Sequence, residues 1–100
     1  MVIREVRTVD GLGRIILPTA FKMALGLEKG DKVNLRIVGN LVVLHKMTAH
    51  PEEEYQGIEV DELGRVLIPK ELLEKMGWKI GDKIGVQPFG DDMLAFRLEK

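Results

Sequence analysis

Side chains that could carry out acid–base chemistry are sparse in this chain and lack the partners that catalysis requires. Asp10 and Asp61 occupy equivalent positions of a repeated motif, and Asp91 and Asp92 are adjacent. No nucleophile with a nearby base and no cofactor-binding motif accompanies them. The chain has no cysteine, and its two histidines lack the spacing of a metal site. We therefore expect no enzyme, no catalytic residue, no metal and no cofactor.

The remaining candidate function is the binding of an anionic partner by positively charged side chains. The chain carries 15 Lys and Arg residues against 16 Asp and Glu residues, a net charge of −1, but the charges are unevenly distributed. Residues 1–47 contain eight basic and four acidic residues, whereas residues 48–100 contain seven and twelve. A chain polarised in this way can present a basic face despite its neutral total. We expect that face on the N-terminal half.

The overall composition is that of an ordinary globular protein, with 45% hydrophobic and 31% charged residues. No apolar run approaches the roughly 18 residues that a membrane span requires, and no signal-peptide pattern opens the chain. The absence of cysteine fits a reducing compartment. These features predict a cytoplasmic protein without a membrane partner.

A duplicated motif organises the sequence. VDGLGRIILP at residues 9–18 returns as VDELGRVLIP at residues 60–69, and ten of the 25 positions in 9–33 are identical to those in 60–84. Seven of the remaining 15 pairs exchange one apolar residue for another. We interpret the pattern as an internal duplication. The expected division is repeat 1 at residues 1–47, a linker at residues 48–56 and repeat 2 at residues 57–100.

Each repeat predicts the order strand, turn, strand, helix, strand, turn, strand. In repeat 1, DGLG has the chemistry of a turn, and RIIL is predicted to be a short buried strand. Pro18 is expected at the first helical position, and Gly26 is expected to end the helix in a left-handed conformation. Gly39 and Asn40 then predict a hairpin turn. An isolated unit of this kind has a marginal core and unpaired strand edges, so the second copy is expected to complete the fold.

The combination V-D-x-L-G-R-[IV]-[IL]-[IL]-P, followed by a short helix, a glycine and G-D-K-[VI], resembles the AbrB-like family. These are swapped-hairpin, looped-hinge-helix transcription factors, which include SpoVT-type regulators and MazE-type antitoxins. The resemblance implies that two units interleave into one small DNA-binding barrel. We therefore expect a mainly β fold with two short helices, in which two ββαββ-type repeats form a swapped-hairpin β-barrel as an intramolecular pseudo-dimer. The alternative is a homodimer in which like repeats pair between chains.

The resemblance also implies where DNA would be contacted. It assigns contacts to basic residues at the end of the first strand, after the glycine turn and on the helix. In repeat 2 this pattern is incomplete, because Ile58 stands where repeat 1 has Arg7 and Leu73 replaces Lys22. The expectation is therefore one strong and one weak half-site. The predicted DNA-binding residues are Arg4, Arg7, Arg14, Lys22, Arg65 and Lys70.

The predicted function is a DNA-binding transcriptional regulator associated with the nucleoid, with duplex DNA as its partner. Two alternatives stay open. Arg14 and Arg65 can instead pair with Asp10 and Asp61 and hold their own turns in place. The chain can also be a protein-interaction module, either antitoxin-like or a partner subunit of another regulator, without strong DNA binding of its own.

Overall fold

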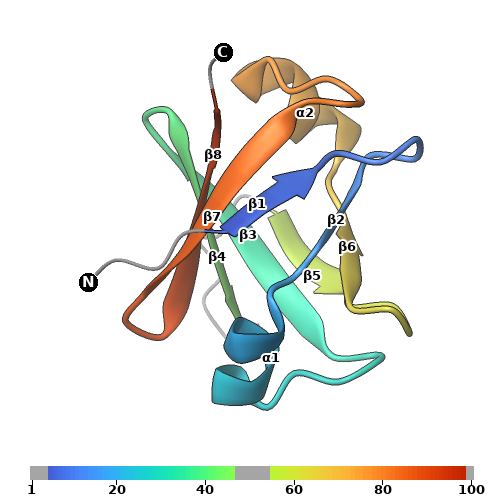
Figure 1. The fold of residues 1–100 in the computed structure, drawn as a ribbon, viewed down its shortest axis with the longest axis vertical. Helices are drawn as coiled ribbons and strands as arrows, with labels where there is room; N and C mark the ends of the chain where they lie inside the picture. The colour runs from blue at the N-terminus through green and yellow to red at the C-terminus, as the bar shows by residue number, and fades with distance from the viewer. Residues whose placement is uncertain (1–4, 47–54, 99–100) are drawn as a thin grey trace.

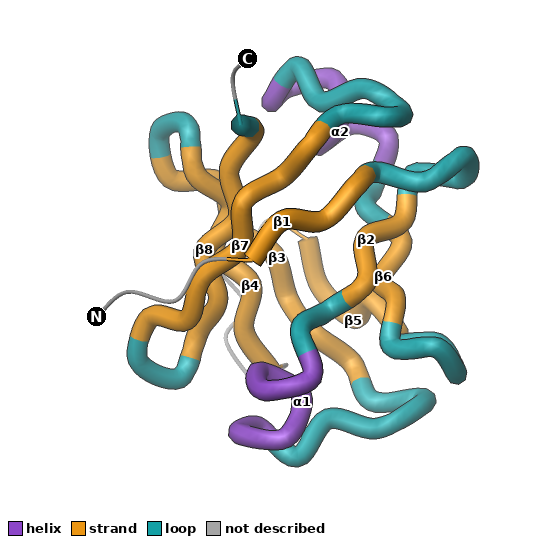
Figure 2. The backbone as a smooth tube through the Cα atoms, in the orientation of Figure 1, coloured by secondary structure: helices purple, strands orange, loops and turns teal. Residues whose placement is uncertain are grey.

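The computed structural model of the chain describes residues 5–46 and 55–98, which form eight strands and two short helices (Figures 1 and 2). Repeat 1 contains β1 (Glu5–Thr8), β2 (Arg14–Ile16), α1 (Thr19–Leu25), β3 (Lys32–Val38) and β4 (Leu41–Lys46). Repeat 2 contains β5 (Tyr55–Glu59), β6 (Arg65–Leu67), α2 (Lys70–Met76), β7 (Lys83–Phe89) and β8 (Asp92–Arg97). Strand β5 begins inside the stretch expected to be linker.

Each helix ends at a glycine. Gly26 and Gly77 follow the last helical residues with φ values of 62° and 68°, a left-handed conformation that glycine adopts without steric cost. Pro18 differs from the prediction, because it lies one position before α1 rather than in its first turn. Its ψ of 139° is extended, so the chain turns into the helix only at Thr19.

The strands exchange partners between the repeats. A six-stranded sheet has the order β1-β7-β8-β4-β3-β5, so the first strand of each repeat pairs with the hairpin of the other repeat. Strands β2 and β6 form a separate two-stranded sheet that lies across the larger one (Figure 1). The mainly β, two-repeat fold is thus confirmed, with the repeats paired inside one chain. Within residues 5–46 and 55–98, an isolated bridge joins Val60 to Val66, but the two sheets do not form one closed hydrogen-bonded ring.

The hydrophobic core lies between the two sheets and draws on both repeats. Val33 and Leu35 of β3 are fully buried, as are Leu72 of α2 and Ile84 of β7. Removal of such apolar surface from water is the main favourable contribution to folding. Because each repeat supplies only part of this core, the second copy completes the fold as expected. Neither helix in the described ranges is long or apolar enough to span a bilayer.

The two repeats differ in how their exchanged first strands pair, β5 with β3 and β1 with β7. The register of β3 against β5 shifts between Val33 and Leu35, and the backbone N–H of Gly57 there donates to Asn34 Oδ1 at 3.1 Å. Asn34 is fully buried. At its counterpart Gly85, an added Cβ would come within 2.7 Å of the ring of Phe96. The β1–β7 pairing follows a regular register instead.

Candidate nucleic-acid interface

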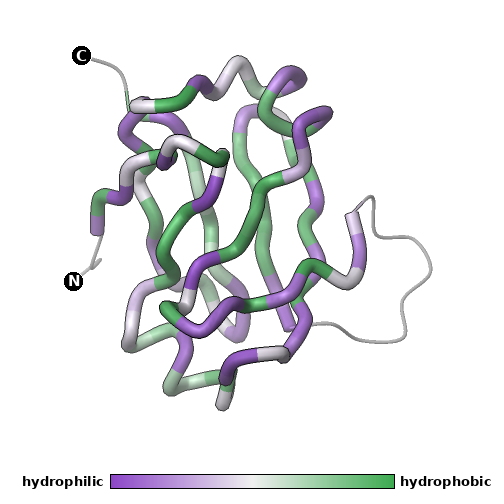
Figure 3. Tube along the Cα trace, turned by 90° about the vertical axis from the view of Figure 1, so that its right-hand side faces the viewer, coloured by the Kyte–Doolittle hydropathy of each residue, from purple (hydrophilic) through white to green (hydrophobic). Residues whose placement is uncertain are grey.

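The two-stranded sheet carries the predicted arginines on its outer side. In the β2–β6 ladder, Arg14 lies opposite Leu67 and Ile16 lies opposite Arg65. The central pair, Ile15 and Val66, faces the core and is buried. Because side chains alternate along a strand, the other four residues share the outward side. We call this side the ribbon face, defined by Arg14, Ile16, Arg65 and Leu67. Figure 3 turns this side of the molecule toward the viewer.

Each ribbon arginine is held by the aspartate that opens its turn. Asp10 Oδ1 accepts the backbone N–H groups of Leu12 and Arg14 at 2.9 and 2.8 Å, and Asp10 Oδ2 accepts Arg14 Nε at 2.7 Å. Asp61 makes the same three bonds in repeat 2, including one of 2.7 Å from Arg65 Nε. The predicted structural role of these arginines is therefore observed in both repeats.

The pairing leaves most of each guanidinium available. A guanidinium has five N–H donors, and only the Nε–H is used in the pair with aspartate. Among the described residues, the terminal nitrogens of Arg14 and Arg65 donate no hydrogen bond. The two side chains keep 25% and 22% of their surface exposed. The aspartates thus orient the arginines without occupying the fork that binds a phosphate or a base edge.

The same bonds predict how stability depends on pH. The N–H of Arg14 is the largest influence on Asp10 and lowers its pKa against the opposing effect of burial. Burial raises the pKa of Asp61, but the bonds from Arg65 and Leu63 outweigh it, and the net pKa is also lowered. A lowered pKa stabilises the fold above the unfolded-state value of about 4, and this stability is lost as pH falls through the folded-state pKa. Wild type should therefore lose thermal stability as the pH falls below about 4.

The control for this prediction is Asp10→Asn, which keeps an oxygen acceptor but removes the titrating proton. Melting temperatures measured from pH 6 to pH 2 should fall less steeply with acid for this variant than for wild type. Identical slopes for the two proteins would contradict the assignment of the acid response to this turn.

Arg7, a predicted DNA contact, donates its hydrogen bonds inside the molecule. It lies on β1 and crosses the seam between β1 and β2, where Nε donates to the carbonyl of Ile16 at 3.0 Å. Its terminal nitrogens donate to Val6 O at 3.1 Å and to Glu5 Oε1 at 2.9 Å. Arg7 therefore closes this seam and keeps fewer free donors than Arg14.

The corresponding seam between β5 and β6 has no arginine across it, although Val60 and Val66 pair there in an isolated β-bridge. Ile58 occupies the position of Arg7 and has no donor with which to bridge the strands. A groove of about 500 Å³ lies there, with Ile58, Leu67 and Pro69 as its apolar lining. Arg14 and Arg65 also line it, together with Glu59 and Asp61. We call it the Ile58 groove.

The helices pack on the turns of the opposite repeat. Lys22 of α1 lies against Gly64, and Leu73 of α2 lies against Gly13. The N–H of Ile68, just before α2, donates to Gly13 O at 2.9 Å, and that of Leu17, just before α1, donates to Gly64 O at 2.9 Å. Each arginine-bearing turn is therefore fixed to the other repeat.

This exchange redistributes the predicted basic residues in space. Arg7 and Lys22 of repeat 1 lie toward the Arg65 end of the ribbon face, through their contacts with Ile16 and Gly64. Lys70, which is exposed at the start of α2, follows β6 on the Arg14 end. Each end of the ribbon face therefore contains residues of both repeats. The expected strong half-site of repeat 1 and weak half-site of repeat 2 do not correspond to these two ends. Arg4 lies outside the described residues.

Sequence reasoning missed the apolar part of this surface. Leu12 and Leu63 at the turn tips are 69% and 62% exposed, and Ile16 and Leu67 are about half exposed. RIIL was expected to be buried throughout, but only alternate residues of a two-stranded sheet face the core. No signal of this alternation is present in the sequence, because Ile15 and Ile16 are the same residue type with opposite exposure.

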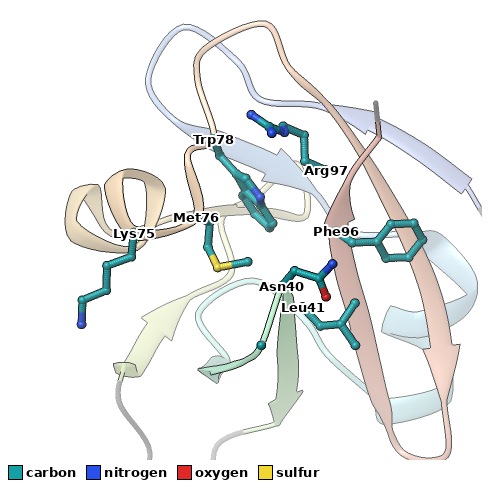
Figure 4. A pocket seen from close by; sticks show the side chains of 8 residues that line it. Asn40, Leu41, Lys75, Met76, Trp78, Phe96 and Arg97 are labelled. Carbon is teal, nitrogen blue, oxygen red and sulfur yellow. The ribbon is translucent and has the colours of Figure 1, made fainter. Parts of the chain in front are cut away.

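One other pocket is a weaker candidate for binding an anion. A pocket of about 320 Å³ between the Gly39–Leu41 turn and the end of α2 is lined by Met76 and Trp78 (Figure 4). Its cations already have internal partners, because Lys75 pairs with Glu71 at 3.2 Å and Arg97 donates to Gly77 O at 2.9 Å. The ribbon face is therefore the better candidate for an anionic partner.

A family model described as antidote-toxin recognition MazE, bacterial antitoxin, matches the chain twice, at residues 6–49 and 59–94. The chain belongs to the MazE antitoxin family. The two matches fall on the two repeats, so this MazE-family chain carries both copies of the domain in a single polypeptide. No curated protein matches the chain.

A solved structure supports the same architecture for this MazE-family chain. The solution structure of PHS018 from Pyrococcus horikoshii is similar with a TM-score of 0.56 and 27% sequence identity. The similarity covers 97% of this chain and 95% of the other. The likeness therefore extends over both repeats.

Proposed function

We propose that this chain is a non-enzymatic, cytoplasmic and nucleoid-associated transcriptional regulator that binds duplex DNA through the ribbon face. The observation that carries the proposal is the placement of Arg14 and Arg65 on one outward surface with their terminal guanidinium nitrogens available. Membership of the MazE family and the resemblance to AbrB-like regulators support it. Lys22 and Lys70 flank the face and extend its positive charge.

The shape of the interface suits the major groove. That groove is wide enough to admit a two-stranded β-ribbon, and β2 and β6 form such a ribbon. Arginine can hold a phosphate, or the O6 and N7 atoms of guanine, with two parallel hydrogen bonds. Asp10 and Asp61 contribute by fixing the direction of each guanidinium before the partner arrives.

A salt titration tests the proposal. Binding that neutralises phosphates releases counterions, so the logarithm of the affinity falls linearly with the logarithm of salt concentration. With Arg14 and Arg65 each neutralising one phosphate, the slope should be about −2 or steeper. Fluorescence anisotropy with a labelled duplex would measure it. A wild-type protein that retains no duplex even at low salt would refute the proposed function.

A protein partner is the second candidate, favoured by the exposed leucines at the turn tips and by the antitoxin family. Capture from native lysate before and after nuclease treatment separates the two. A partner held through DNA is lost on digestion, whereas a protein bound directly to the ribbon face is retained.

A further inference from the structure

The ribbon face has approximate twofold symmetry in its backbone but not in the side chains that flank it. In the β1–β2 seam, Arg7 covers the strand junction and donates to the carbonyl of Ile16. In the β5–β6 seam, Ile58 leaves the apolar groove described above, with Leu67 and Pro69. The β1–β2 seam is therefore covered by a cationic side chain, whereas the β5–β6 seam contains the apolar Ile58 groove.

The helices and turns increase this difference. The Arg65 end receives Lys22 from α1, whereas Leu73 takes the equivalent place at the Arg14 end. The turn between β1 and β2 has Gly11 where the turn between β5 and β6 has the exposed Glu62. The Arg65 end thus combines Arg65 with Lys22 and Glu62, and the Arg14 end combines Arg14 and Lys70 with more apolar surface.

An apolar groove flanked by two arginines suits a particular part of duplex DNA. The 5-methyl of thymine is the apolar group that a base pair presents in the major groove. Arg14 and Arg65 line the same groove and can contact the phosphates on either side of such a base. Glu59 and Asp61 also line the groove, and Asp61 is paired with Arg65. The groove and its two arginines are therefore suited to bind a thymine base together with its neighbouring phosphates.

We propose, on the basis of the function proposed above, that the ribbon face binds a non-palindromic duplex site in a single orientation. The Arg65 end, with Lys22, contacts phosphates, and the Ile58 groove receives a thymine methyl in the other half of the site. Ile58 is then a residue that determines specificity, because it distinguishes the two halves.

Selection from a random duplex pool tests this inference with wild type, Ile58→Arg and the conservative control Ile58→Val. Wild type and Ile58→Val should enrich a non-palindromic consensus with a thymine in one half. Ile58→Arg restores the side chain of repeat 1 and should enrich a more symmetric site. A palindromic wild-type consensus would overturn the inference while leaving duplex binding intact. Failure of wild type to retain any duplex would refute the proposed function itself.

A second measurement does not depend on whether Ile58→Arg folds. Deoxyuridine replaces thymidine at each thymine of the selected site in turn, which removes only the methyl group. For wild type, affinity should fall about fivefold or more at a thymine in one half of the site and change little in the other. Equal effects in both halves, or no effect anywhere, would overturn the inference.

Discussion

Replacing Arg14 and Arg65 together with glutamine is expected to remove most of the affinity for duplex DNA. Each arginine that contacts DNA typically contributes about 1–3 kcal/mol, so the double variant should bind at least about 30-fold more weakly. The salt slope should become shallower by about two, because two phosphate contacts are lost. Fluorescence anisotropy across a salt series measures both quantities, and each single variant should lose about one unit of slope.

The matched control is Arg36→Gln. Arg36 is exposed on β3 of the six-stranded sheet, away from the ribbon face, so the same change in charge is made elsewhere on the molecule. It should alter binding far less than either ribbon variant. Thermal unfolding must accompany the comparison, because the ribbon arginines also pair with Asp10 and Asp61. A folded double variant with wild-type affinity and slope would show that DNA is not bound at this face.

Leu72→Ala is expected to destabilise the fold strongly. Leu72 is fully buried on α2 in the core shared by both repeats. Truncation of such a leucine removes buried apolar surface and leaves a cavity, at a cost of about 2–5 kcal/mol. In a domain of this size the melting temperature should fall by roughly 10 °C or more. Calorimetry or circular dichroism would measure the change.

Leu67→Ala makes the same chemical change on the ribbon face, where the side chain is 54% exposed. Its effect on the free energy of unfolding should stay within about 0.5 kcal/mol. Similar losses of stability in the two variants would show that the core does not depend on α2 as the structure indicates.

Local features of the fold could be predicted from the sequence because their causes are local. The spans of α1 and α2 follow from Pro18 and Pro69 before them and from the left-handed glycines after them. The hairpin turn at Gly39 is likewise confirmed, since Val38 pairs directly with Leu41. The duplication itself predicted that each repeat would need the other.

Features that depend on tertiary exchange could not be predicted in the same way. Sequence spacing places Lys22 with Arg14, but packing places it against Gly64 and thus beside the turn of Arg65. Arg7 matches the family pattern for DNA contact, yet its donors are used across the β1–β2 seam. Neither result has a local signal, because both depend on which strand of one repeat lies beside the other.

The shortness of the β2–β6 ladder limits what its arginines can read. Their paired positions are two residues apart on the ladder, which corresponds to about 7 Å along a strand. In B-form DNA that length equals about two base-pair steps. The central footprint is therefore very small, and selectivity over a longer operator must come from the flanking helices or from how readily the duplex bends.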